Sequence, residues 1–179
     1  LLNIFFYQSA STMVDSALFK SYEDNDLRKT LYFSKSATGG YNYKGNYSGF
    51  GVLYGGLATD ELYLIRAECS ARNGNSESSL KDLNTLLVDR YKAGTYQPLK
   101  ELNAEAVLSK VLDERRKELI GRGTRWSDLR RLNLDPKRAI TLKRLINGKS
   151  YTLSPNDPRY VFLIPDDEIR NSGIQQNPR

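Results

Sequence analysis

The chain has 179 residues, 39% of them hydrophobic, which is enough for the core of one domain or of a large piece of one. It contains no histidine, so His-dependent triads, His-ligated zinc and imidazole acid–base chemistry are excluded. A single cysteine, Cys69, excludes an internal disulfide and a cysteine-cluster metal site, and no cofactor is expected.

No window is long and apolar enough to span a membrane. The opening LLNIFFYQSAS lacks the features of a signal peptide, so we expect a fragment or a processed piece.

The net charge of +6 is concentrated in one segment. Residues 113–149 hold 12 Lys and Arg against 5 Asp and Glu, whereas the remainder holds 15 against 16. A basic segment can indicate nucleic-acid binding. Here acidic residues lie among the arginines at helical spacings, which favours ion pairs within and between helices instead. These acidic residues are Asp113, Glu114, Glu118 and Asp128.

Residues 1–57 are expected to be irregular and rich in loops. Met13–Tyr22 has the pattern of a short helix, and Leu27–Phe33 that of extended structure after a cap or turn at Asp24–Asp26. Residues 39–56 contain seven of the 13 glycines together with four tyrosines, a composition that works against a regular helix or strand. We expect a long loop there, with room for a short hairpin.

The second segment, residues 58–179, begins with a pair of helices. Thr59 or Asp60 can cap the first helix, and Gly74 is a natural stop. Asn75 and Ser76 can cap the second helix, and because the connection is about three residues long, the two helices should pack antiparallel. The predicted buried face of the first helix is Leu62, Ile65 and Cys69, widened by Tyr63 and Ala67, and that of the second is Leu80, Leu83, Leu87 and Tyr91.

A second helix pair is expected after Asn103. The apolar stripe of its first helix runs from Val107 to Leu119, and two glycines at 121 and 123 end it. A short fourth helix places Trp126, Leu129 and Leu132 on one face. The two units begin near residues 60 and 104, an offset longer than the tetratricopeptide period, so the arrangement is tetratricopeptide-like without being that repeat.

The remainder is expected to be less regular. Residues 133–159 form a basic, irregular connection in which Lys149–Leu153 has the pattern of a strand. Tyr160–Ile164 is an apolar run of strand type. Pro165 ends it and suits the first turn of a short helix through Asp166–Ile169. The acidic residues of that helix complement its dipole, and their spacing is not that of a Ca²⁺-binding EF-hand loop.

Three stretches of the second segment carry recognisable motifs. They are ATDELYLIRAECSARNGNSESSLKDLNTLLVDRY at 58–91, ERRKELIGRGTRWSDLRRLN at 114–133, and FLIP, EI and QNP between 162 and 178. In this order they resemble the C-terminal half of the SusD/RagB family, nutrient-binding outer-membrane lipoproteins of Bacteroidetes. Position 122 carries Arg where the family pattern usually has Glu. Because the charge is reversed, an ion pair that the family forms through this position is not expected to be kept here.

The resemblance implies a mainly α fold, a SusD-like superhelix of antiparallel, tetratricopeptide-like helix pairs with long loops and a minor β element. It implies a lipid anchor at an N-terminus outside this chain, and a place on the extracellular face of the outer membrane. The implied partner is a SusC-like TonB-dependent transporter that the protein covers as a lid. The implied function is non-catalytic capture of nutrient oligosaccharides. Peptide capture, or a helical adaptor that contacts only protein, is the alternative.

The residues of the family motif are interpreted as structural. Trp126 shares a helical face with two leucines, which favours packing over sugar stacking, and Arg125 and Asp128 are expected to fix the helix junction through ion pairs. Glu114 and Glu118 lie on one helical face, expected to be exposed and salt-bridged, which does not suit paired catalytic carboxylates on opposite sides of a glycosidic bond. The full set of motif residues is Glu114, Arg115, Arg116, Glu118, Arg125, Trp126 and Asp128.

The glycine- and tyrosine-rich loop is the predicted ligand contact. Sugars need flat apolar faces for their C–H sides and amides for their hydroxyls. An extended segment would present its alternating tyrosines on one side. The predicted contacts are Tyr41, Asn42, Tyr43, Asn46 and Tyr47. The other interpretations are a plain surface loop, or a loop covered by the rest of the protein or by the transporter.

Overall fold

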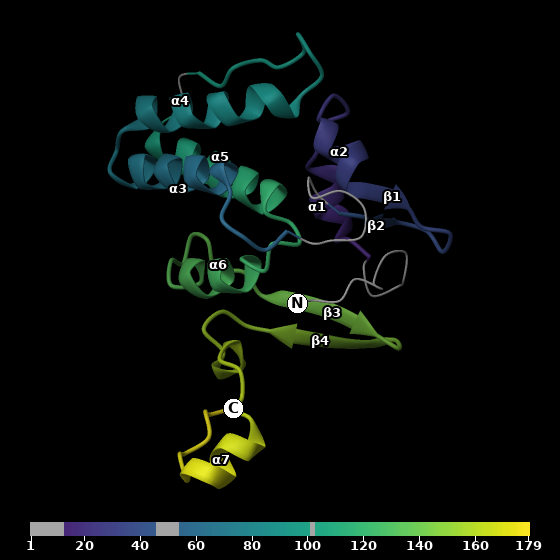
Figure 1. Cartoon of the computed structure of the whole chain (residues 1–179), viewed down its shortest axis with the longest axis vertical. Coiled ribbons are helices and arrows are strands. Elements are labelled where there is room, and N and C mark those ends of the chain that lie inside the picture. The colour runs from purple at the N-terminus through teal and green to yellow at the C-terminus, as the bar shows by residue number, and fades with distance from the viewer. Residues whose placement is uncertain (1–12, 46–53, 101–102) are drawn as a thin grey trace. The chain divides into compact units, whose positions relative to one another are not determined.

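The computed structural model describes residues 13–45, 54–100 and 103–179. They form a mainly helical fold with two small two-stranded sheets, as predicted (Figure 1). The chain divides into two compact units, Leu1–Gly123 and Thr124–Arg179. The predicted boundary between residues 57 and 58 lies inside the first unit. Across the described ranges, no helix combines the length and the apolarity that a membrane span requires.

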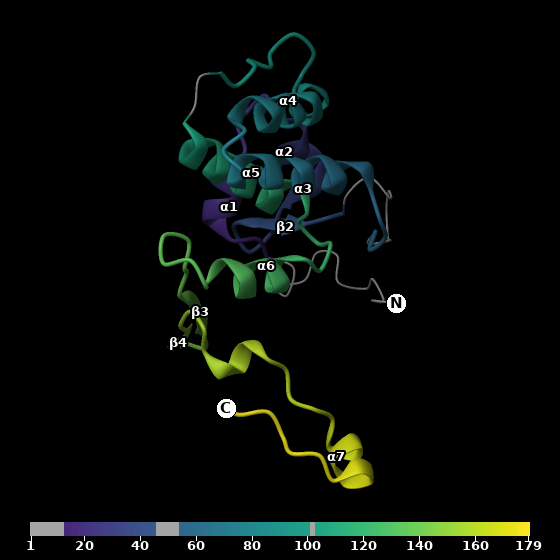
Figure 2. The ribbon, with the colours of Figure 1, turned by 90° about the vertical axis from the view of Figure 1, so that its left-hand side faces the viewer.

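Three helices build the main core of the first unit. Helices α3 (Thr59–Arg72) and α4 (Ser76–Leu87) run antiparallel, and α5 (Ala104–Glu118) packs against α3, as Figures 1 and 2 show. A turn of 3₁₀ helix, η2 (Val88–Arg90), extends α4. The predicted first helix pair is confirmed. The buried cluster of these elements is Leu64, Ala67, Ala71, Leu83, Leu86, Leu87, Tyr91, Val107, Leu108, Val111 and Leu119.

Side-chain caps mark where α4 and α5 begin, as expected, whereas α3 begins after Ala58 without a side-chain cap, so the predicted cap at Thr59 or Asp60 is wrong. The Asn75 carboxamide accepts a hydrogen bond from the Ser78 N–H at 3.0 Å, and Asn103 accepts one from the Ala106 N–H at 2.9 Å. Gly74, with φ of 77°, adopts the left-handed conformation that ends α3 and turns the chain into α4. These local signals therefore place the starts of α4 and α5 and the end of α3.

The predicted buried face of α3 is wrong in its three main residues, whereas Ala67 and Tyr63, predicted to widen it, do pack into the core. Leu62, Ile65 and Cys69 are all exposed. The helix instead turns a face rich in small residues toward α4 and α5, because alanine lets neighbouring helices approach closely. The buried apolar residues of α3 are Leu64, Ala67 and Ala71.

The N-terminal part of the first unit contains more regular structure than expected. Helix α1 (Ser16–Lys20) lies within the predicted helix. Strand β2 (Tyr41–Tyr43) lies at the start of the predicted loop and forms a hairpin with β1 (Phe33–Lys35), which precedes that loop. The two strands are antiparallel, with Ser34 opposite Asn42. A second buried cluster, next to this hairpin, consists of Leu18, Tyr22, Tyr32 and Phe33.

The extended structure predicted for Leu27–Phe33 is wrong, because residues Leu27–Tyr32 form helix α2. The Asp26 carboxylate caps this helix by accepting a hydrogen bond from the Arg28 N–H at 3.0 Å. The local cap and the partners of Arg28 outweigh the strand preference of the aromatic residues.

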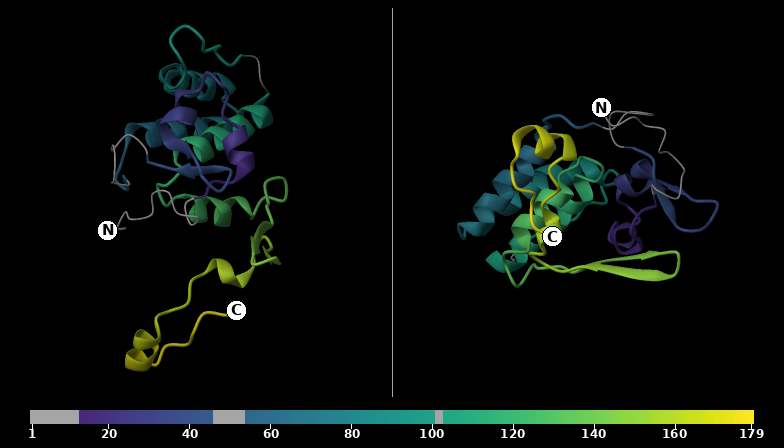
Figure 3. Two further views of the ribbon diagram at one scale, coloured as in Figure 1. Left: turned by 90° about the vertical axis from the view of Figure 1, so that its right-hand side faces the viewer. Right: turned by 90° about the horizontal axis from the view of Figure 1, so that it is seen from below.

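The second unit contains one longer helix, a hairpin and a C-terminal arm. Its elements are α6 (Arg125–Leu132), β3 (Leu142–Ile146), β4 (Lys149–Leu153), η3 (Pro158–Tyr160) and α7 (Asp166–Ser172). Figure 3 shows β3 and β4 as an extended antiparallel ribbon. Because α5 and α6 belong to different units, the packing of the second predicted helix pair stays a prediction.

Within this unit, the predictions for β4 and α7 are confirmed, whereas two others are wrong. The connection 133–159 contains β3, which pairs with β4 through a tight turn at Asn147 and Gly148, both with positive φ. Tyr160–Ile164 forms no strand: Tyr160 ends the turn η3, and the residues after it continue without regular structure.

Candidate ligand-binding site

The predicted tyrosine site lies on the short hairpin of the first unit. Tyr41, Asn42 and Tyr43 form strand β2, so their side chains alternate between its two faces, as the pattern predicted. Asn46 and Tyr47 lie outside the residues that the structure describes. The geometry of this candidate site therefore concerns its first three residues.

All three described side chains pack within the first unit. The Tyr41 ring is half-buried and stacks on Phe19, with ring centroids 3.5 Å apart. The Tyr43 hydroxyl donates a hydrogen bond to the Ile120 carbonyl at 3.1 Å. Asn42 is only 3% exposed, and within the described part of the chain its carboxamide oxygen has no hydrogen-bond partner.

A buried ion cluster, formed by Asp26, Arg28, Glu114 and Glu118, joins α2 to α5. The Arg28 guanidinium donates to Asp26, to Glu114 and to Glu118, each at 2.8 Å. All four side chains are at most 1% exposed. The predicted ion pairing of the two glutamates is confirmed, but their predicted exposure is wrong. Sequence reasoning missed Arg28, because nothing local relates it to residues 86 and 90 positions away.

Neighbouring cations complete the charge balance of the buried ion cluster. Glu118 also accepts a hydrogen bond from Arg90 at 2.8 Å, and Glu114 lies 2.6 Å from the Lys117 ammonium. Burial by itself raises the pKa of Glu114, but Arg28 and Lys117 outweigh it and hold that pKa below its ordinary value. Burial likewise lowers the pKa of Arg28, and the surrounding carboxylates more than reverse this shift. Both groups therefore stay charged at neutral pH.

Arg122, which departs from the family pattern, is also buried in the first unit. Its guanidinium lies 3.6 Å from Asp60 and 3.6 Å from Glu61, and it donates to the Gly56 carbonyl at 2.7 Å. It also lies over the Tyr54 ring, 4.8 Å from its centroid. The reversed charge at this position thus finds acidic partners at the start of α3.

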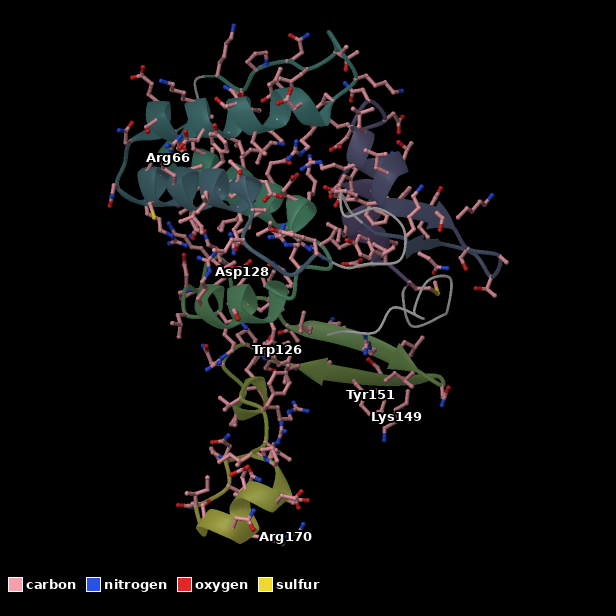
Figure 4. The ribbon with its side chains drawn as sticks, viewed as in Figure 1. Arg66, Trp126, Asp128, Lys149, Tyr151 and Arg170 are labelled. Atoms are coloured by element: carbon pink, nitrogen blue, oxygen red, sulfur yellow. The ribbon has the colours of Figure 1, made fainter. Side chains whose placement is uncertain are left out.

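A groove of about 520 Å³ lies along the hairpin of the second unit. Its wall includes Trp126 from α6, Arg144 from β3, Tyr151 from β4 and Arg159 from η3. Figure 4 labels Trp126 on α6 and Tyr151 on β4. Sequence reasoning did not single out this groove, although the run from Pro136 to Asn156, which contains no acidic residue, was a visible signal.

Trp126 is half-buried and packs within its own unit. Its ring stacks on Phe162 with centroids 5.5 Å apart, and its indole N–H donates to the Tyr160 carbonyl at 2.9 Å. Asp128 forms an ion pair with Arg131 of the same helix at 2.9 Å. These contacts hold the start of α6 to the segment after η3.

Within the described ranges, no group of three or more acidic or cysteine side chains is placed to hold a metal ion. The acidic residues after Pro165 lie in the first turn of α7, where they complement the helix dipole. One of them, Asp167, forms an ion pair with Arg170 of the same helix.

Residues 59–179 match the model of the SusD family. The chain belongs to the SusD family. The family model thus spans α3 to α7 and includes the charged motif around Trp126. A comparison with curated proteins found no significant match.

Solved structures of SusD-like proteins share this fold. A SusD superfamily protein from Parabacteroides distasonis has a TM-score of 0.62 and 17% identity over 98% of this chain and 45% of its own. A putative sugar-binding protein from Bacteroides vulgatus has a TM-score of 0.61 and 24% sequence identity. The match covers 90% of this chain and 37% of that protein. A SusD-like carbohydrate-binding protein from the same species has a TM-score of 0.58 and 20% sequence identity. The match covers 90% of this chain and 40% of that protein. This SusD-family chain spans less than half the length of each.

Proposed function

We propose that this chain is part of a non-catalytic binding protein that captures nutrient oligosaccharides at the cell surface. The match of residues 59–179 to the SusD family carries the proposal. Two structurally similar proteins described as carbohydrate- or sugar-binding support it. Binding would be reversible: preformed donors and acceptors replace water at the sugar hydroxyls, and aromatic faces cover the C–H sides of the rings.

The charges of the helical core support binding without catalysis. Glu114 and Glu118 are the only paired carboxylates that the family motif offers, and both are occupied by arginine or lysine. A general acid must hold a proton near neutral pH and reach a substrate oxygen. Glu114 satisfies neither condition, because it is buried and its pKa is lowered by Arg28 and Lys117 against the effect of burial.

Tyr41, Asn42, Tyr43, Asn46 and Tyr47 remain the proposed ligand contacts of this half of the protein. Tyr41 is the best placed of the described candidates, since its ring is held by stacking on Phe19 and is only partly buried. The unpartnered carboxamide oxygen of Asn42 would accept a hydrogen bond from a sugar hydroxyl only if the hairpin opens, because Asn42 is buried.

The family also suggests where the protein works. We infer a lipid anchor in the full-length protein, a place on the outer face of the outer membrane, and a SusC-like TonB-dependent transporter that it covers as a lid. The transported ligand would then pass from the binding protein into the barrel. The alternatives are peptide capture, or an adaptor that binds only protein.

Titration of the full-length protein with a panel of neutral and acidic oligosaccharides and with peptides tests the proposal. We expect a dissociation constant in the micromolar to millimolar range, about −8 to −4 kcal/mol, for at least one oligosaccharide. Binding that weakens in Tyr41→Ala, with Tyr63→Ala as the matched control on α3, would support the predicted contacts. Binding to the transporter alone, with no saccharide bound, would establish the adaptor instead.

A further inference from the structure

The hairpin groove of the second unit carries an excess of positive charge. No acidic residue occurs between Pro136 and Asn156. Two cations near this run are compensated, since Arg138 pairs with Asp135 and Arg159 with Asp157. The remaining cations of the hairpin, namely Lys143, Arg144 and Lys149, form no ion pair within the described part of the chain.

Strand register gathers two of these cations around one tyrosine. Arg144 lies directly opposite Tyr151 in the antiparallel pair, so their side chains leave the same face of the hairpin. Lys149 is two positions before Tyr151, on that same face, and its ammonium lies 5.4 Å from the centre of the Tyr151 ring. Figure 4 shows Lys149 and Tyr151 leaving β4 on the same side.

The groove offers aromatic surface beside these charges. Tyr151 is 48% exposed, so part of its ring is open to a ligand. Trp126 also lines the groove and is held in place by Phe162 and by the Tyr160 carbonyl. Because its indole N–H already has an acceptor, Trp126 contributes apolar surface, while Arg144 contributes charged donors.

This combination fits one kind of ligand. An open guanidinium forms two parallel hydrogen bonds with a carboxylate or a sulfate, and an unpaired neighbouring ammonium adds attraction. The apolar face of a pyranose ring fits against Tyr151. The volume of about 520 Å³ suits a few sugar rings and not an extended nucleic-acid strand.

We propose that the groove lined by Trp126, Arg144, Tyr151 and Arg159 binds acidic oligosaccharides, whose sugars carry carboxylates or sulfates. This inference rests on the proposed function and specifies its substrate class. It assigns Arg144 and Lys149 to the anionic group, and Tyr151 to the sugar ring.

The test uses the full-length protein and a short oligogalacturonate, with the methyl-esterified form of the same oligosaccharide as the neutral counterpart. We expect the acidic form to bind about tenfold more tightly or better, and this preference to shrink as salt is added. In Arg144→Met/Lys149→Met the acidic form should lose this advantage, while circular dichroism stays unchanged. The matched control, Lys81→Met/Lys92→Met, removes two exposed cations from the first unit and should bind like the wild type.

The outcomes separate the two proposals. Equal binding of the acidic and esterified forms, or acid binding that survives in Arg144→Met/Lys149→Met, would overturn the groove and leave the glycan-binding function in place. Binding of neither form, nor of any other oligosaccharide, would overturn both. Single-stranded DNA or anionic phospholipid vesicles that bind as tightly, with the same loss in the double variant, would make the groove a general anion site and refute the assignment to glycans.

Discussion

Arg28 and Glu114 meet at 2.8 Å with neither side chain exposed, although 86 positions separate them in the chain. This pair ties the N-terminal helix α2 to the most charged stretch of the family motif. A buried charge that loses its partner is costly, because water cannot replace the missing interaction. The motif therefore contributes to holding the first unit together, and its glutamates are structural.

Replacing Arg28 should destabilise the first unit strongly. Arg28→Met leaves the carboxylates of Glu114 and Glu118 without their shared guanidinium, and we expect a loss of about 3–5 kcal/mol in the free energy of unfolding. Urea denaturation measures this loss. The neighbouring Lys29→Met breaks a surface pair with the fully exposed Asp24 and a cation–π contact with Phe19, and should cost about 1 kcal/mol or less. Equal effects of the two substitutions would contradict a buried ion cluster.

Two glycines of the same loop should respond differently to alanine. Gly121 and Gly123 have φ of 74° and 77°, so alanine is strained by about 1–2 kcal/mol at either position. At Gly121 the added Cβ would also lie 2.6 Å from the Tyr43 ring, whereas at Gly123 it meets nothing within 4 Å. We expect Gly121→Ala to cost about 1–3 kcal/mol more than Gly123→Ala in chemical denaturation. A difference near zero would show that the tyrosine moves aside freely.

Stability should fall in acid partly because of Glu114. The pKa of this carboxyl, raised by burial but lowered more by Arg28 and Lys117, lies below its ordinary value of 4.5 in the folded protein. The unfolded chain therefore binds the proton more readily, and the stabilisation is present above pH 4.5 and lost as the pH falls through the folded pKa.

Unfolding curves at neutral pH and at about pH 3 test this. Glu114→Gln should be much less stable than the wild type at neutral pH, and the gap should narrow in acid. Asp113→Asn, which removes an exposed carboxylate from the same helix, serves as the control. A gap that is independent of pH would argue against an ionised Glu114 in the folded state.

The single tryptophan of the chain should report the packing of the second unit. Phe162 covers one face of Trp126, at a centroid distance of 5.5 Å with the rings 15° apart. Phe162→Ala should shift the fluorescence emission of Trp126 to longer wavelength and cost about 0.5–1.5 kcal/mol. Leu163→Ala, at the next position, is the control, and an unshifted spectrum in Phe162→Ala would mean that the ring is not covered.

Local signals in the sequence determined the end of α3 and the starts of α4 and α5. Asn75, Gly74 and Asn103 act within three residues of themselves, so their effect on α3, α4 and α5 is visible in the sequence. The same holds for the turn between β3 and β4 in principle, because Asn147–Gly148 is a strong hairpin signal. Strand β3 itself has no buried face, so its residues carry no alternating apolar pattern that predicts a strand.

Tertiary structure decided which faces are buried and which charges pair. Helix α3 carries apolar residues on two sides, and only the positions of α4 and α5 select the side with Leu64 and Ala67 over the side with Leu62 and Ile65. Likewise, Glu114 and Glu118 are surrounded by cations in sequence, but their main buried partner, Arg28, comes from another helix. Burial and long-range pairing depend on the whole fold. The local pattern of a helix can therefore show where the helix ends, but it cannot show which face is buried or which distant charges pair with it.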